Sequence, residues 1–300
     1  MQLTPILGHS YYIRGGTNTG VFVMEDGGAV VIDPGLSTIR GRKIARCLKE
    51  SSLKAIACIC SHEHLDHYEA YTGLLEIFPD CAFYCPVETK PFLETPELFF
   101  TYIYGGKPHK KLLGNTKAEV FDFSITDTLG QQTLSFAGGS LEILDLKGHS
   151  HGMACVLTPD KVLFLSDALI DYNLMKKYEF PFIFHVDHFL NSLDKIRKTD
   201  FDRGLIAHSR EIYDRKEILL LTDINEENVL KYLQQIESLL ERPMSREHLL
   251  AAIIQNNGFD FNYKEYHYYY STLGSMLSRL INENRVDYAI ENGILSYSRC

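Results

Sequence analysis

The first half of the chain alternates short apolar runs with amphipathic segments. Strands are predicted where β-branched and aromatic residues cluster, and helices where apolar residues recur every three to four positions. The expected strands span residues 11–14, 19–25, 29–32, 53–60 and 82–85, and the expected helices span 40–50 and 68–78. Buried strands that alternate with helices indicate an α/β protein whose sheets are covered on both faces.

The second half repeats the strand pattern and then becomes helical. Strands are expected at residues 133–136, 141–146, 154–158, 162–165 and 204–207, and a helix is expected at 189–198. Beyond Tyr213 the pattern predicts helices at residues 225–240, 245–255 and 271–284, followed by a hairpin at 286–297. We therefore predict a catalytic domain at residues 1–213 and a helical, winged-helix-like C-terminal domain at residues 214–300.

Residues 86–128 interrupt the order of strands and helices. The first part of this insertion is rich in proline and aromatic residues, including Phe99, Phe100 and Tyr102. A long insertion of this kind is either packed irregular structure or a lid over a site. For its aromatic part, residues 92–104, the interpretations that remain open are core or interface packing and a lid.

Composition narrows the class of protein. The 300 residues are 45% hydrophobic and 23% charged, which is typical of a globular chain with one large domain and an appendage. The net charge of −9 disfavours a broad nucleic-acid-binding surface. The expected helix at 271–284 carries a single basic residue, Arg279, so packing or homodimer formation is the favoured role of the tail over DNA binding.

The lengths of the apolar runs and the number of cysteines indicate the cellular compartment in which the protein is expected. No apolar run reaches the roughly 20 residues that span a bilayer, and the first residues do not resemble an export signal. The seven cysteines form an odd number, which favours reduced thiols over a framework of disulfides. The sequence therefore predicts a cytoplasmic protein without a membrane segment.

Candidate metal ligands cluster in the run Ser-His-Glu-His-Leu-Asp-His at residues 61–67, directly after a predicted buried strand. In an extended segment His62 and His64 point the same way and can converge on one cation. If a helix begins near Leu65, Asp66 and His67 project in another direction from its first turn. This short segment can thus contribute ligands to two neighbouring ions.

Further candidate ligands follow other predicted strands, at the points where each strand ends. His149 follows the strand at 141–146, Asp167 follows 162–165, and His208 follows 204–207. Sheets of α/β proteins place their sites at such strand ends. Imidazole and carboxylate groups suit zinc, iron or manganese, so the ligand types do not select among these metals.

The order of these residues along the chain resembles the motif pattern of the metallo-β-lactamase superfamily. The resemblance rests on Asp33 after a strand, the His-x-His-x-Asp-His run at 62–67, His149, Asp167 and His208. It implies a four-layer αβ/βα sandwich with two divalent metal ions, zinc being the expected metal. It places His62, His64 and His149 on the first ion, Asp66, His67 and His208 on the second, and Asp167 on both.

The resemblance implies that Asp33 does not bind metal but orients a ligand histidine. The alternative interpretation is a simple Asp-Pro-Gly turn after a strand. Asp66 and Asp167 are the expected catalytic carboxylates. The implied reaction is hydrolysis by a hydroxide that bridges the two ions and attacks a small ester, thioester or lactone.

Within the superfamily the ligand set resembles that of glyoxalase II. The run after His67 departs from that branch, because Tyr68-Glu69-Ala70 stands where two glycines usually follow. A nuclease of phosphodiesterase or ribonuclease type, and a non-hydrolytic diiron redox or sensor protein, remain alternatives. Candidate contacts to a small-molecule substrate are Asn18, Lys176 and Tyr178. The pair His185 and His188 is interpreted as a helix start, with a third metal site as the alternative.

Overall fold

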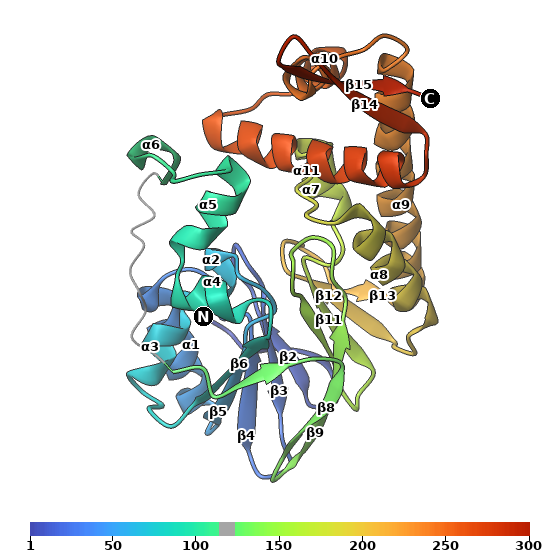
Figure 1. The fold of residues 1–300 in the computed structure, drawn as a ribbon. Helices are drawn as coiled ribbons and strands as arrows, with labels where there is room; N and C mark the ends of the chain where they lie inside the picture. The colour runs from blue at the N-terminus through green and yellow to red at the C-terminus, as the bar shows by residue number, and fades with distance from the viewer. Residues whose placement is uncertain (114–123) are drawn as a thin grey trace.

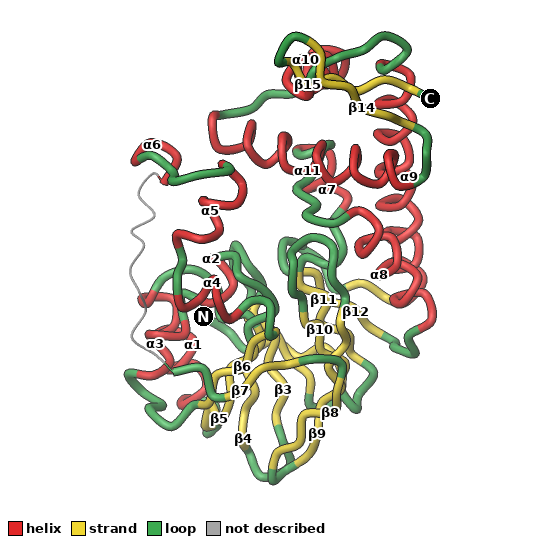
Figure 2. The backbone as a smooth tube through the Cα atoms, viewed as in Figure 1, coloured by secondary structure: helices red, strands yellow, loops and turns green. Residues whose placement is uncertain are grey.

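A computed structural model describes residues 1–113 and 124–300. Two β-sheets face each other, and helices cover their outer faces (Figures 1 and 2). The first sheet has the strand order β1-β2-β3-β4-β5-β6-β7. Its strands are β1 Thr4–Leu7, β2 Ser10–Ile13, β3 Thr19–Val23, β4 Gly28–Ile32, β5 Lys54–Ile59, β6 Ala82–Pro86 and β7 Asp127–Leu129. Strands β1 to β4 pair antiparallel, and β4 to β7 pair parallel.

The second sheet has the order β13-β12-β11-β10-β9-β8. Its strands are β8 Gln132–Phe136, β9 Gly139–Asp145, β10 Ala154–Leu157, β11 Val162–Ser166, β12 Arg203–Ile206 and β13 Tyr213–Asp214. Only β11 and β12 pair parallel in this sheet; the other neighbours are antiparallel. The parallel pair aligns the ends of β11 and β12, the two strands that Asp167 and His208 follow.

Three layers of apolar side chains hold the sandwich together. Ile44 on α1 (Thr38–Glu50) and Leu74 on α3 (Tyr71–Leu75) pack on the outer face of the first sheet. A second cluster, which includes Ile59 and Phe164, fills the space between the sheets. Helices α8 (Val186–Lys198) and α9 (Arg215–Leu239) cover the second sheet. The predicted αβ/βα sandwich is thus confirmed.

The C-terminal segment shares its core with the second sheet. It comprises α9, α10 (Arg246–Asn257), α11 (Tyr263–Asn282), β14 (Val286–Glu291) and β15 (Ile294–Arg299). Leu165 of β11, Ile218 of α9 and Leu277 of α11 belong to one hydrophobic cluster. Helix α11 lies beside the insertion helix α5 at the top of the molecule (Figure 1). The tail is therefore packed onto the sandwich close to the strand ends.

In its described part, the insertion forms three short helices, α4 (Lys90–Glu94), α5 (Glu97–Tyr104) and α6 (Lys110–Leu113). Phe99, Phe100 and Ile103 form an apolar cluster, and Tyr268 of α11 packs against it. The aromatic part of the insertion is therefore packed between the sandwich and the tail. Residues 114–123 of the predicted insertion lie outside the described residues.

Several element boundaries differ from the sequence predictions. The helix expected at 68–78 is two short helices, α2 (Leu65–Tyr68) and α3, because the Ala70 amide donates to the Gly35 carbonyl at 2.8 Å. Helix α11 begins eight residues earlier than residue 271. Asn262 and Glu265 form a capping box there, which fixes the start at Tyr263. Among the described helices, none is both long and apolar enough to cross a bilayer.

All seven cysteines are free, as the odd number predicted. Six are buried, and burial raises the pKa of the Cys81 and Cys85 thiols to about 12. Only Cys300 is exposed. We expect a disulfide-exchange reagent to modify one thiol per native chain and all seven after denaturation. Removing Cys300 by Cys300→Ser should eliminate the native reaction; rapid labelling of several thiols in the native protein would contradict this burial.

Candidate metal centre

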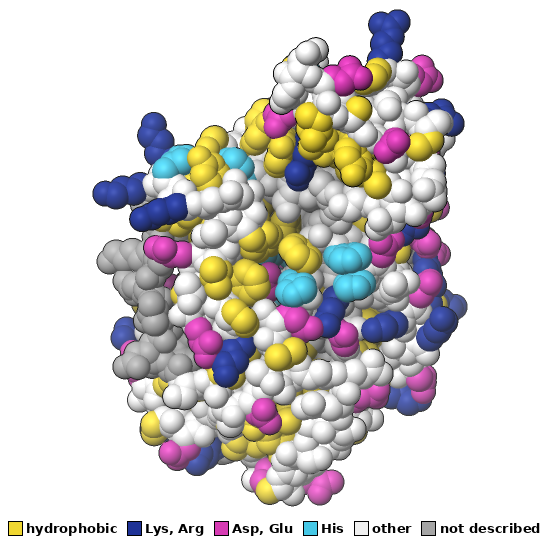
Figure 3. All heavy atoms as spheres, viewed as in Figure 1, with side chains coloured by type: hydrophobic (Ala, Val, Ile, Leu, Met, Phe, Trp, Pro, Cys, Tyr) yellow, Lys and Arg dark blue, Asp and Glu magenta, His cyan; other side chains and the backbone are white. Residues whose placement is uncertain are grey.

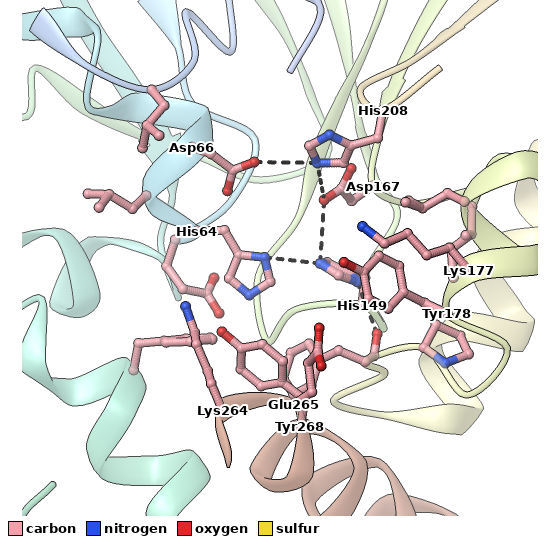
Figure 4. Close-up of a pocket in the computed structure, with 18 of the residues that line it drawn as sticks. His64, Asp66, His149, Asp167, Lys177, Tyr178, His208, Lys264, Glu265 and Tyr268 are labelled. Atoms are coloured by element: carbon pink, nitrogen blue, oxygen red, sulfur yellow. Dashed lines mark hydrogen bonds and ion pairs between the residues drawn. The ribbon is translucent and has the colours of Figure 1, made fainter. Parts of the chain in front are cut away.

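The predicted ligands meet at one edge of the sandwich, where strands of both sheets end. His62 and His64 lie in the loop after β5, and Asp66 and His67 lie in α2. The second sheet contributes the others: His149 follows β9, Asp167 follows β11 and His208 follows β12. Figure 4 shows His64, Asp66, His149, Asp167 and His208 pointing toward one another at the floor of a pocket.

These side chains form two sets. His62, His64, His149 and Asp167 each offer a ligand atom, and these atoms all lie within 4.8 Å of one another. Asp66, His67 and His208 form a second set with the same spacing. The structure thus brings together all seven residues that the sequence singled out, in two neighbouring clusters.

Asp167 lies at the junction of the two clusters. Its Oδ2 atom is 3.6 Å from His149 Nε2 and 3.8 Å from His62 Nε2. The same oxygen is 3.3 Å from His67 Nε2 and 3.4 Å from His208 Nε2. One carboxylate oxygen therefore faces nitrogen atoms of both sets, which is the placement expected of a bridging group.

Asp33 holds two parts of the centre in position. Its Oδ1 accepts a hydrogen bond from the Ser61 amide at 2.8 Å, and its Oδ2 lies 2.9 Å from His67 Nδ1. The Ser166 hydroxyl also donates to Oδ2, at 2.7 Å. Asp33 and Ser166 both adopt a φ of 50°, a conformation that non-glycine residues rarely take and that is often found at functional sites. Asp33 is thus more than a turn residue, because its carboxylate fixes the orientation of His67.

Backbone carbonyl groups orient two other imidazoles. His149 Nδ1 lies 3.1 Å from the Phe182 carbonyl, and His208 Nδ1 lies 2.8 Å from the Gly16 carbonyl. Each of these contacts uses Nδ1 and leaves Nε2 directed toward the centre. Such contacts fix the tautomer and the ring orientation of a ligand histidine.

Two further hydrogen bonds hold the ligand-bearing segments. The Ser150 hydroxyl donates to the Glu63 carboxylate, which joins the loop of His149 to the loop of His62 and His64. The Thr17 hydroxyl donates to Asp66 Oδ2 at 2.9 Å. The positions of His149 and Asp66 are therefore set by neighbours as well as by their own strands and helices.

The donor set fits divalent metal ions. His62 and His67 are fully buried, yet their Nε2 atoms have no hydrogen-bond partner among the described residues. Buried polar atoms are almost always satisfied, so two such atoms facing a carboxylate fit the role of metal ligands. Burial lowers the pKa of His62 and His64 well below the usual value for histidine, and neighbouring imidazoles lower it further. Both rings are thus neutral, the form that binds metal.

A pocket of about 870 Å³ opens above this centre. Its walls are largely apolar and come from the insertion, from the segment after β11 and from α11, with Phe99, Phe182 and Tyr268 as examples. On the face shown in Figure 3, apolar side chains gather between the insertion and the C-terminal helices, and histidines lie close to them. A cavity of this size, with polar groups confined to its floor and mouth, is typical of a small-molecule site.

The predicted substrate contacts lie in different places. Tyr178 lines the pocket, and Lys177 lines it in place of Lys176, which does not. Asn18 is buried away from the pocket lining, and its amide donates to the carbonyl groups of Ile206 and Ser209. Asn18 therefore holds the loop that carries His208 near its β-strand.

The pair His185 and His188 marks a helix start. His185 is the N-cap of α8, and its Nδ1 accepts from the His188 amide at 3.3 Å. Among the described residues, the candidate metal clusters do not include either histidine. The structure thus agrees with the interpretation as a helix start.

A sequence comparison now identifies the family. The model of the metallo-beta-lactamase superfamily matches residues 12–208, about two thirds of the chain. The chain belongs to the metallo-beta-lactamase superfamily. Membership supports a metal-dependent hydrolase, and the matched segment contains all seven candidate ligands and Asp33.

Solved structures of the superfamily share the fold over nearly the whole chain. A beta-lactamase domain protein from Burkholderia ambifaria is 14% identical, with a TM-score of 0.75 over 99% of this chain and 93% of that chain. A metallo-beta-lactamase family protein from Thermus thermophilus is 17% identical, with a TM-score of 0.73 over 99% of this chain and 97% of that chain. The similarity therefore extends through the C-terminal helices.

Among curated proteins, the hydroxyacylglutathione hydrolase of Blochmanniella pennsylvanica (strain BPEN) is 34% identical over 61 residues. This match spans 20% of this chain and only 23% of that relative's length. It is a local similarity, and the two proteins are not matched over most of their lengths.

Several residues at this superfamily site were not singled out from the sequence. Ser61 and Ser166 each precede a candidate ligand directly, so their place beside His62 and Asp167 was a usable signal. Lys264 and Tyr268 also line the pocket, but they lie on α11, beyond the segment that the family model matches. No motif marks these two residues in the sequence.

Proposed function

We propose that this protein is a dinuclear hydrolase that cleaves a small ester, thioester or lactone. The observation that carries the proposal is the meeting of two ligand sets at Asp167, on the floor of a largely apolar pocket. The first set would hold one divalent ion, the second set would hold another, and Asp167 would contact both. Zinc is the proposed metal, because imidazole and carboxylate ligands suit it, as they also suit iron and manganese.

Two bound cations supply a water molecule with a lowered pKa and polarise the bond under attack. The protein's own groups then position the reactants. Asp66 is the more exposed of the two catalytic carboxylates, with 40% of its side chain accessible against 12% for Asp167. Held by Thr17, Asp66 is placed to accept the proton of the attacking water and to transfer it toward the leaving group.

The shape of the pocket supports a small organic substrate. Aromatic side chains from three separate segments narrow the space above the ligands, and α5 and α11 cover it. A folded nucleic acid would need an open, basic surface, whereas this protein carries a net charge of −9. The local similarity to a hydroxyacylglutathione hydrolase adds support for an acyl compound.

Metal quantification joined to a substrate panel tests the proposal. Purified protein loaded with zinc and freed of excess metal should contain close to two ions per chain. It should hydrolyse at least one member of a panel of acyl thioesters, aryl esters and lactones, and removal of the metal by a chelator should stop this hydrolysis. Reloading with zinc should restore it.

The panel should also contain a phosphodiester probe. Hydrolysis confined to that probe would replace the proposal with a phosphodiesterase function. A content of one ion or none per chain would contradict the dinuclear centre, whatever the panel shows.

A further inference from the structure

We propose that Lys264 of α11 binds a negatively charged group of the substrate, so that the natural substrate is an anionic ester or thioester. This inference rests on the proposed function and names the class of substrate for the same pocket. The charged group is a carboxylate or a phosphate, and the part of the substrate near the metals is an apolar acyl or aryl group. Lys264 is then a specificity-determining residue supplied by the C-terminal segment.

The position of Lys264 is the first support. Lys264 and Tyr268 rise from α11 on the opposite side of the pocket from Asp66 and His208 (Figure 4). The Lys264 ammonium lies 5.2 Å from the ring centre of Phe100 and 5.5 Å from that of Tyr268. The two rings thus flank the ammonium at the pocket wall, across the pocket from Asp66 and His208.

The second support is that this ammonium lacks a partner of opposite charge. Within the described parts of the chain, Lys264 Nζ forms no ion pair and donates no hydrogen bond. The residue as a whole is exposed, but partial burial of its ammonium removes water and lowers the pKa of this group. The negative charge of Asp66 acts in the opposite direction and raises the pKa. A cation partly removed from water and left unpaired is stabilised by an anion that enters the pocket.

The carboxylates of the pocket are already engaged. The Glu69 carboxylate accepts a hydrogen bond from the Ser37 amide at 2.9 Å, and that of Glu265 accepts one from the Asn262 amide at 2.8 Å. Glu63 is bound by Ser150, and the two remaining acids, Asp66 and Asp167, belong to the metal centre. Among the described residues that line the pocket, Lys264 is therefore a cation that remains available to an incoming anion.

Lys177, the other lysine of the pocket, is placed differently. The Lys177 ammonium lies 4.8 Å from the ring centre of the neighbouring Tyr178, and a hydrogen bond to Tyr178 raises the pKa of Lys177.

Tyr268 adds a hydrogen-bond donor beside Lys264. Burial raises the pKa of the Tyr268 hydroxyl, so that this group keeps its proton at neutral pH. The Tyr268 hydroxyl has no hydrogen-bond partner within the ranges that the structure describes.

Apolar side chains complete the argument for an amphipathic substrate. Leu169, Phe180 and Phe182 also line the pocket. The Phe182 ring contacts His64 and His149 of the metal centre on one side and Tyr268, the neighbour of Lys264, on the other. A wholly polar substrate would leave these walls without contacts, and a wholly apolar one would leave Lys264 unpaired. The pocket thus fits a molecule that is apolar near its scissile bond and anionic at its other end.

A pair of thioesters that differ only in charge tests this proposal. S-Benzoyl mercaptoacetate carries a carboxylate, S-benzoyl mercaptoacetamide is neutral, and the released thiol is measured for both. Wild-type protein should show a kcat/KM roughly 10- to 100-fold higher for the anionic probe, the range of one charge-assisted hydrogen bond. Lys264→Met should remove this preference by slowing the anionic probe alone, and Lys264→Arg should retain most of it.

The control variant is Lys216→Met, which removes an exposed lysine of α9 outside the pocket and should keep the full preference. S-Benzoyl mercaptoethyl phosphate, used as a third probe, distinguishes a phosphate from a carboxylate substrate. Equal effects of Lys264→Met on charged and neutral probes, or no effect on either, would overturn the assignment.

A binding measurement separates this inference from the proposed function. Benzylthioacetate and benzylthioacetamide are uncleavable analogues, and their Kd values can be measured by calorimetry in the metal-loaded protein. Wild type should bind the anionic analogue more tightly, and Lys264→Met should bind both alike. If no thioester, ester or lactone of the panel is cleaved, the proposed function fails, whereas this ratio of affinities still decides the role of Lys264.

Discussion

Asp167→Ala is expected to lower the rate of hydrolysis by at least about 1,000-fold. One oxygen of Asp167 lies 3.3 to 3.8 Å from imidazole nitrogen atoms of four histidines drawn from both ligand sets. Its removal takes a negative charge from between the two proposed ions, which then repel each other without compensation. We expect the content of bound metal to fall from two ions per chain to one or none, as measured by elemental analysis.

The matched control is Asp80→Ala. The Asp80 side chain is 83% exposed, and among the described residues it forms a single surface ion pair, with Lys54 at 3.7 Å. This variant should keep the metal content and the rate of the wild type, because such pairs contribute little. If Asp167→Ala retained substantial activity with two ions bound, the chemistry would lie elsewhere in the pocket.

The sequence predicted most strands and helices well because their signals are local, whereas the sandwich itself was implied by the resemblance to the superfamily. Strand β5 is an apolar run that ends just before the His-x-His segment, and such a run can be recognised without knowledge of the rest of the fold. The ligands follow strands in the same way, so their convergence also follows from the alternation of strands and helices. Motif spacing and sheet topology therefore pointed to the same edge of the molecule.

The start of α11 could not be predicted in this manner. Residues 263–270 are dominated by tyrosines, which have only moderate helix propensity, and so the expected helix began at residue 271. In the structure, Tyr268 and Tyr269 pack against Phe182 and Phe180, and these contacts join segments far apart in the chain. The helix is stabilised there by tertiary packing and by its capping box, which local patterns do not reveal.

Because local patterns did not predict the first turns of α11, part of the candidate site was also missed. The metal ligands belong to the segment that the family model matches, whereas Lys264 and Tyr268 belong to the part of α11 that the sequence pattern missed. The chemistry of the centre could thus be predicted from motifs, but the wall opposite it could not. Selection among substrates depends on that wall, which is why the sequence left the substrate open.

Asp33→Asn is expected to weaken metal affinity roughly 10- to 100-fold, although Asp33 is not a proposed ligand. The Asp33 carboxylate accepts hydrogen bonds on both oxygens, from the Ser61 amide on one and from Ser166 and His67 on the other. An asparagine has only one oxygen, so one of these buried donors would face an amide NH₂ group. We expect His67 to lose its fixed orientation, at a cost in stability of about 1–3 kcal/mol.

Competition with a coloured chelator measures this loss of affinity, and a denaturant titration measures the stability. Excess zinc should restore most of the activity of Asp33→Asn but not that of Asp167→Ala, because only the former keeps all proposed ligands. Asp26→Asn is the matched control, since Asp26 also accepts a backbone hydrogen bond, from Gly28 at 2.9 Å, but lies outside the metal centre. If Asp33→Asn lowered the stability but left the metal affinity unchanged, Asp33 would only stabilise the turn after β4 and would not support metal binding.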